Sequence, residues 1–91
     1  MLNRAIIFGG TRGVGYEIAN VLSKKGNTEL IFTGRNIENV MEVEKKFDKN
    51  VLGMELDMSC TVSVENFKAK VDKIKFKPNV LIFNAGYLSL K

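Results

Sequence analysis

A glycine-rich run, residues 9–15, carries the residue types best suited to hold a phosphate. It follows the apolar residues 5–8, which predict a buried strand, and precedes apolar residues spaced along one helix face. Gly9 is expected to make a tight turn with positive φ, Gly13 to leave no Cβ beside a pyrophosphate, and Gly15 to let the helix lie close to the strand. The first N–H groups of the helix, at the positive end of its dipole, would face the anion.

Two arginines accompany this run: Arg12 lies inside it and Arg35 follows about twenty residues later. At the position of Arg35, an NAD site has an Asp or Glu that binds the ribose 2′-hydroxyl. A carboxylate would repel a 2′-phosphate, whereas two guanidinium groups would bind it through charge-assisted hydrogen bonds. The pair therefore favours NADP(H) over NAD(H). The alternative is that both are ordinary exposed arginines.

Strand-like and helix-like segments alternate along the chain in the order βαβαβαβ. The strand-like runs are mostly continuous and apolar, as in parallel strands covered on both faces. Right-handed crossovers then give an α/β, Rossmann-like fold, a truncated doubly wound one with a four-stranded parallel sheet in the order 3-2-1-4. The ligand crevice is expected at the carboxyl ends of the first and fourth strands. The predicted strands are 4–8, 28–33, 51–56 and 79–83, and the predicted helices are 13–25, one that begins after residue 36, and 63–74.

Helix ends are predicted from three residues. Gly26 follows Lys24 and Lys25, as expected where a helix ends. Asn36 is expected to cap the second helix, and Ser63 the third.

Composition excludes several kinds of chemistry. The chain of 91 residues contains no histidine, so it holds no His-based triad, His metal site or His general base. Its one cysteine, Cys60, has no disulfide partner within the chain and is expected to be a small packing residue. The apolar run after Arg4 is too short for a signal peptide or a membrane span. We therefore expect one small domain in a reducing, cytoplasmic setting, with no membrane partner.

The net charge of +4 comes from the last third of the chain. Residues 61–91 hold six lysines against Glu65 and Asp72. A nucleic-acid patch is one interpretation. We favour the solvated face of an amphipathic helix, because apolar residues lie between the lysines at helical spacing, and we expect no nucleic-acid partner.

Polar and small residues follow the third and fourth predicted strands. Asp57 closes the third strand, where a carboxylate can accept a hydrogen bond from the exocyclic amine of adenine, although it can equally be a turn residue. Asn84, Ala85 and Gly86 follow the fourth strand. The two small residues would let the backbone pass close to a cofactor, and the asparagine can form a hydrogen bond across the loop. Such a tripeptide is also a common turn signal.

Taken together, these segments resemble the short-chain dehydrogenase/reductase family over the whole chain. Residues 8–15 correspond to the family's Thr-Gly-x-x-x-Gly-x-Gly, Asp57 to its adenine-site Asp, and residues 83–86 to its Asn-Asn-Ala-Gly. The resemblance implies a pyrophosphate on the glycine-rich turn, a 2′-phosphate near the arginines, adenine at Asp57 and the cofactor ribose after the fourth strand. The cofactor-binding residues it implies are Gly9, Thr11, Arg12, Gly13, Val14, Gly15, Arg35, Asn36, Asp57, Asn84, Ala85 and Gly86.

The chain departs from the family pattern in three ways. Phe8 replaces the Thr, and Phe83 replaces the first Asn; both lost side chains are mainly structural in the family. The family's catalytic Ser and Tyr-x-x-x-Lys, which lie beyond the fourth strand, have no counterpart here. Tyr87 and Lys91 have the Tyr-x-x-x-Lys spacing but fall on the loop after that strand. No catalytic and no metal-binding residue is therefore assigned.

These observations predict that residues 1–91 form the NADP-binding half of a Rossmann-fold domain. In a full-length protein it would support hydride transfer between NADP(H) and a carbonyl or alcohol; whether this chain is itself an enzyme stays open. The alternative is a non-catalytic nucleotide-binding or protein-interaction module. An apolar fourth strand at the sheet edge also predicts self-association or pairing with a partner.

Overall fold

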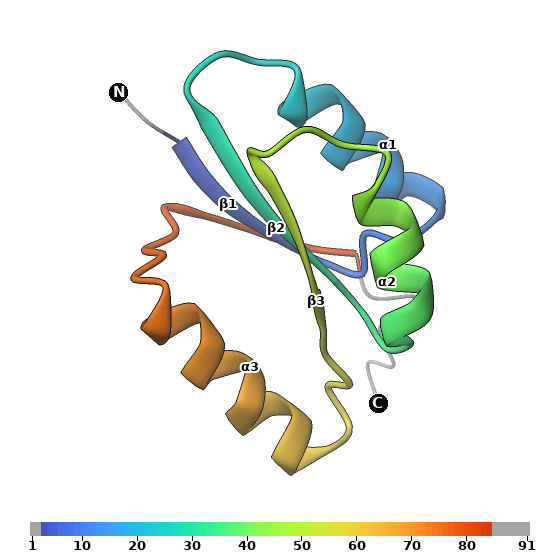
Figure 1. Ribbon diagram of the computed structural model, residues 1–91, viewed down its shortest axis with the longest axis vertical. Coiled ribbons are helices and arrows are strands. Elements are labelled where there is room, and N and C mark those ends of the chain that lie inside the picture. The colour runs from blue at the N-terminus through green and yellow to red at the C-terminus, as the bar shows by residue number, and fades with distance from the viewer. Residues whose placement is uncertain (1–2, 85–91) are drawn as a thin grey trace.

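A computed structural model describes residues 3–84, in which strands and helices alternate as expected (Figure 1). Each of the first three strands is followed by a short connection into the next helix, and the crossovers make all four strands of the described residues parallel. The elements are β1 (Asn3–Phe8), α1 (Gly13–Ser23), β2 (Thr28–Gly34), α2 (Ile37–Glu44), β3 (Val51–Glu55), α3 (Thr61–Lys73) and β4 (Val80–Phe83).

The sheet has the order β3-β2-β1-β4, which confirms the predicted α/β topology. Ile7 in β1 is in register with Phe32 in β2 on one side and with Ile82 in β4 on the other. Helices α1 and α2 cover one face of the sheet, and α3 covers the other (Figure 1). The chain therefore changes face between β3 and β4, so that the carboxyl ends of β1 and β4 meet where a ligand crevice is expected.

Successive strand residues point into two separate cores, which explains why the strands are continuously apolar. Ile7 and Phe32 are fully buried under α1 and α2. Ile6 and Ile31, one residue earlier, are buried on the opposite face together with Phe67 of α3. Phe67 is buried, whereas Lys68, Lys70 and Lys73 are exposed, which confirms that α3 is an amphipathic helix.

Two predicted helix ends are wrong. Helix α1 ends at Ser23, two residues before the predicted end at Lys25, and the residue after it with a left-handed backbone conformation is Asn27, with φ 59°, and not Gly26. Helix α3 begins at Thr61, so Ser63 lies inside its first turn and does not cap it. The Ser63 hydroxyl instead accepts a hydrogen bond from the backbone N–H of Asp57, at 2.8 Å. An asparagine tolerates the left-handed region at low cost, which is why it can replace a glycine there.

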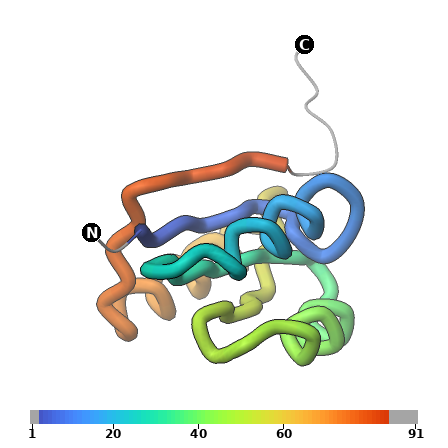
Figure 2. Tube along the Cα trace, turned by 90° about the horizontal axis from the view of Figure 1, so that it is seen from above, coloured from blue at the N-terminus to red at the C-terminus, as the bar shows by residue number. Residues whose placement is uncertain are grey.

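The two edges of the sheet differ. On β3, the backbone N–H of Gly53 donates to Glu44 Oε2 of α2 at 2.8 Å, so a side chain of this chain occupies that edge donor. On β4, Leu81 is 53% exposed and Phe83 is 61% exposed, and the strand runs along the outside of the molecule (Figure 2). The apolar fourth strand is therefore an exposed edge among the described residues, as predicted.

Neither a membrane-spanning helix nor a metal site is found in the part of the chain that the structure describes. None of the helices within residues 3–84 has the length and apolar character needed to cross a bilayer. Within the same range, His, Cys, Asp and Glu side chains nowhere gather in groups of three or more that could hold a metal ion.

Candidate cofactor site

The glycine-rich turn between β1 and α1 has the positive φ that was predicted for Gly9. Gly9 has φ 90° and Gly13 has φ 64°, both in the left-handed region that favours glycine. A Cβ built on Gly13 would meet no atom within 4 Å. Space beside Gly13 is thus open for a ligand, while its backbone conformation disfavours any other residue.

Gly15 allows α1 to lie against the turn. A Cβ at this position would collide with the carbonyl oxygen of Gly9 and would lie 2.6 Å from Nδ2 of Asn84. Real Cβ atoms essentially never come that close to other atoms, so only glycine fits here without movement of its neighbours. The close approach of helix and strand predicted for Gly15 is confirmed.

The turn is held from two neighbouring strands. Thr33, near the end of β2, accepts a hydrogen bond from the N–H of Gly9 through Oγ1 at 3.1 Å, and its carbonyl accepts from the N–H of Gly10 at 2.9 Å. Asn84, after β4, donates from Nδ2 to the carbonyl of Gly9 at 3.4 Å, which is the predicted bond across the loop. Thr33 was missed in the sequence, where its only signal is its place directly before Gly34.

The amino end of α1 is suited to an anion. Its N-cap, Arg12, is extended and makes no side-chain capping bond, and the first turn holds no acidic residue. In contrast, Asn36 caps α2 as predicted, and its Oδ1 accepts from the N–H of Asn39 at 3.1 Å. The first N–H groups of α1 therefore remain available, at the positive end of the helix dipole, beside the open space at Gly13.

The two arginines emerge from touching segments. A Cβ on Gly34 would lie 2.6 Å from Cγ2 of Thr11, so the turn after β1 packs directly on the end of β2. Arg12 follows Thr11 and Arg35 follows Gly34, and both are exposed. The contact therefore puts the backbone of two cationic residues at neighbouring points of the carboxyl end of the sheet.

Asp57 is held by the residues that follow it. Its Oδ1 accepts hydrogen bonds from the Ser59 hydroxyl at 2.6 Å and from the Ser59 N–H at 3.0 Å. These bonds, with a smaller contribution from the charge of Arg35, hold the pKa of Asp57 below its ordinary value of 3.8. At neutral pH the group is therefore a carboxylate that can accept further hydrogen bonds. Like Ser63, Ser59 was not predicted as part of this site.

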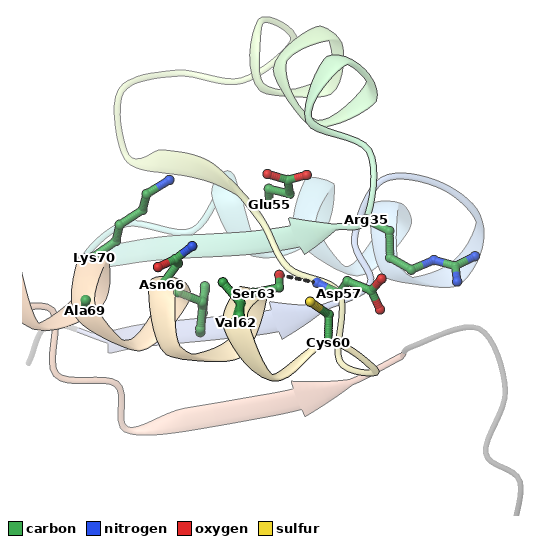
Figure 3. Close-up of a pocket in the computed structure, with 10 residues that line it drawn as sticks. Arg35, Glu55, Asp57, Cys60, Val62, Ser63, Asn66, Ala69 and Lys70 are labelled. Carbon is green, nitrogen blue, oxygen red and sulfur yellow. Dashed lines mark hydrogen bonds between the residues drawn. The ribbon is translucent and has the colours of Figure 1, made fainter.

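A cavity of about 500 Å³ opens beside Asp57 (Figure 3). Arg35 and Asp57 line it at the carboxyl end of the sheet, and residues of α3 form its long wall. Cys60 lies at the same end and is exposed, so the prediction that it is a packing residue is wrong.

The predicted site residues gather at one edge of the molecule. All those within residues 3–84 follow the carboxyl ends of the four strands or open α1. Val14, in the first turn of α1, is 64% exposed, and Ala85 and Gly86 lie outside the described residues, as does the Tyr87–Lys91 pair. The described members of this set are Gly9, Thr11, Arg12, Gly13, Val14, Gly15, Arg35, Asn36, Asp57 and Asn84.

The two phenylalanines that replace residues of the family's glycine and asparagine motifs contact each other. Phe8 and Phe83 are in register on β1 and β4, and their rings stack with centroids 4.6 Å apart and planes 9° apart. Phe67 of α3 approaches Phe8 edge-on at 6.0 Å. An aromatic cluster therefore joins the two strands at the point where the family has polar side chains.

An open glycine turn after β1, an uncapped start of α1 and a carboxylate after β3 are the features of a Rossmann-like doubly wound fold. The sequence profile of the short chain dehydrogenase family matches residues 3–91. The chain belongs to the short-chain dehydrogenase/reductase family. Membership implies a nicotinamide cofactor, NAD(H) or NADP(H), and the open turn at Gly13 fits its pyrophosphate.

Similar proteins include reductases and dehydrogenases. The chain is 34% identical over 85 residues to the 3-oxoacyl-[acyl-carrier-protein] reductase FabG of Buchnera aphidicola, covering 93% of this chain and 34% of that protein. It is 32% identical over 89 residues to the human polyprenol dehydrogenase, covering 92% of this chain and 27% of that protein. The chain thus spans about a third of the length of the curated relatives it matches.

Solved structures agree on the fold. The Sniffer protein of Caenorhabditis elegans superimposes with a TM-score of 0.85 at 30% identity, covering 97% of this chain and 39% of that one. The menthone neomenthol reductase of Mentha piperita gives a TM-score of 0.84 at 22% identity, covering 96% of this chain and 32% of that one, and supports the fold alone.

Proposed function

We propose that residues 1–91 are the NADP(H)-binding half of a short-chain dehydrogenase/reductase. In the full-length protein this half would support hydride transfer between NADP(H) and a carbonyl or alcohol. The observation that carries the preference for NADP(H) is the Thr11–Gly34 contact. It supports the preference because it brings Arg12 and Arg35 together at the carboxyl ends of β1 and β2, where a 2′-phosphate would need them. The catalytic Ser and Tyr-x-x-x-Lys would be supplied outside this chain, and we expect the isolated chain to bind nucleotide without turnover.

Each part of the site has a proposed role. The turn and the amino end of α1 would bind the pyrophosphate, and the ionised Asp57 would accept from the adenine amine. Thr11 and Asn36 would lie near the adenosine ribose, and Asn84 would line the cofactor ribose with Ala85 and Gly86. The lone cysteine fits a cytoplasmic setting, which we propose for the whole protein.

The charge at position 35 provides the test. Arg35→Asp should weaken NADPH binding about tenfold to a hundredfold, since a charge-assisted hydrogen bond is replaced by repulsion, and should leave NADH equal or preferred. Titration of the full chain with each nucleotide, followed by nucleotide fluorescence, measures both affinities.

Lys49→Asp is the matched control. It makes the same charge change at an exposed residue between α2 and β3, at the opposite end of the sheet from the glycine-rich turn. We expect it to leave the ratio of the two affinities unchanged. If Arg35→Asp also leaves that ratio unchanged, Arg35 does not bind the 2′-phosphate.

A protein-interaction module remains the second candidate. It is favoured by the exposed apolar residues of β4, where pairing with a second copy or with another strand would cover Leu81 and Phe83.

A further inference from the structure

The cavity beside Asp57 extends well past the place where adenine would bind. Its wall on α3 runs from Val62 to Lys70. These two residues are eight positions apart, which corresponds to a rise of about 12 Å along the helix and is longer than a purine ring. The proposed nucleotide site uses only the end near Asp57 and Arg35, so the rest of the cavity has no assigned ligand.

The far part of the cavity has its own chemistry. Lys70 lies at the end remote from Asp57, with Asn66 between them, and Glu55 of β3 lines the opposite wall (Figure 3). Val62 and Ala69 supply apolar surface along the wall formed by α3. This wall can therefore pack against an alkyl chain, and Lys70 at its far end presents an ammonium group to an anion.

The orientation of Asp57 connects the two parts. Ser59 occupies Oδ1 twice, so the carboxylate is fixed, and its other oxygen accepts no hydrogen bond from residues 3–84. An exocyclic amine with a single substituent keeps one N–H and can still donate to that oxygen. Its substituent would then leave the ring beside the wall of α3.

From this arrangement, and resting on the nucleotide function proposed above, we infer a second subsite. We propose that the cavity along α3 takes a substituent on the exocyclic amine of adenine, with an anionic end of that substituent bound by Lys70. The site would thus accept adenine nucleotides extended at this nitrogen, and Lys70 would determine the preferred charge of the extension.

Calorimetric titration of the full chain tests this proposal with three probes. They are adenosine 2′,5′-bisphosphate, its N6-(5-carboxypentyl) derivative and its N6-(6-aminohexyl) derivative. We expect the carboxylate derivative to bind at least as tightly as the parent, and the amine derivative to bind more weakly than the carboxylate. A derivative that binds at least tenfold more weakly than the parent would show that the cavity does not receive the chain. Preference for the amine would assign the far end to Glu55 and overturn the role of Lys70.

Lys70→Glu isolates the far end of the cavity. It should weaken binding of the carboxylate derivative about threefold to tenfold, because an exposed attraction between Lys70 and the carboxylate becomes a repulsion. Binding of the parent nucleotide should be unchanged. Lys73→Glu is the matched control, since it reverses the same charge one turn further along α3, outside the cavity. If the two variants weaken binding of the carboxylate derivative equally, the effect comes from the change in net charge alone, and the subsite is refuted.

The parent probe separates this inference from the function on which it rests. If adenosine 2′,5′-bisphosphate itself does not bind, the proposed NADP(H) site fails and the subsite fails with it. If the parent binds but the carboxylate derivative does not, the nucleotide site stands and only the subsite is overturned.

Discussion

At the scale of single residues, the site depends on side chains that hold its backbone and its other side chains in place. Ser59 fixes the carboxylate of Asp57, Ser63 accepts from the Asp57 backbone, and Thr33 holds the turn at Gly9. None of these three was predicted as part of the site. Thr33 acts on a partner 24 residues away, whereas Ser59 forms a turn with Asp57 two residues before it. The residues expected to touch the ligand were predictable, since their types match phosphate and adenine chemistry at known spacings.

Removal of the Ser59 hydroxyl should change the titration of Asp57. Ser59→Ala deletes the largest of the contributions that lower the pKa of Asp57, so the pKa should rise toward its ordinary value. Because the folded pKa is lowered, this carboxylate stabilises the fold above the ordinary pKa, and that contribution is lost as the pH falls through the folded pKa. Carboxyl NMR titration of the variant and the parent chain measures the shift.

The hydrogen bond that remains in the variant limits the expected rise in the pKa of Asp57. The Ser59 N–H still donates to Oδ1 in the variant, so the pKa should not rise all the way. An unchanged pKa would mean that the hydroxyl does not stabilise the ionised form.

At the scale of elements, the predicted order of strands and helices is confirmed, but two helix ends are not. Apolar runs and glycines give the type and order of elements, because burial on both faces of a parallel sheet leaves a strong pattern. Helix ends depend on local competition, as at Ser63, whose hydroxyl bonds to the end of β3. The Phe8–Phe83 stack was also not predicted from the sequence, since the two residues lie 75 positions apart and meet only when β1 pairs with β4.

Substitution at Gly15 tests the packing of α1 on the turn. Gly15→Ala should lower the free energy of unfolding by about 1–3 kcal/mol, because the added methyl group collides with Gly9 and Asn84. It should also weaken nucleotide binding, since the turn must move. Urea unfolding followed by circular dichroism gives the first quantity.

Gly26→Ala is the matched control for this prediction. A Cβ at Gly26 would meet nothing within 4 Å, and its φ lies outside the positive range. We expect this variant to be as stable as the parent or slightly more stable, because the unfolded chain loses entropy. Equal stability of both variants would mean that α1 can shift without cost.

At the scale of the whole molecule, the two edges of the sheet differ in what they offer a partner strand. Glu44 occupies the N–H of Gly53 on β3, whereas β4 exposes Leu81 and Phe83. Exposed apolar edge strands favour pairing between chains. The sequence predicted the exposed β4 edge from strand order and apolarity, but not the bond from Gly53 to Glu44, which depends on the position of a side chain on α2.

Association through β4 can be measured directly. We expect the full chain to associate with rising concentration in sedimentation velocity runs and to bind the dye ANS, because apolar sheet surface is exposed. Leu81→Lys should reduce both effects by placing a charge on the open edge.

Leu52→Lys is the matched control, since it makes the same change on β3 at a residue that is 41% exposed. We expect it to have little effect on association or on ANS binding. A cooperative, monodisperse and ANS-negative monomer would contradict the prediction that β4 pairs.

The strand order also has a consequence for how the chain folds. Ala5 pairs with Leu30 across 25 residues, but with Val80 across 75. In the unfolded chain, closing the longer loop costs about 1 kcal/mol more entropy than closing the shorter one. Docking of β4 on β1 is thus expected to be the late step of folding, preceded by a three-stranded nucleus around β2. Until that step is complete, Asn84 is not in place, and the glycine-rich turn lacks one of the two strands that hold it.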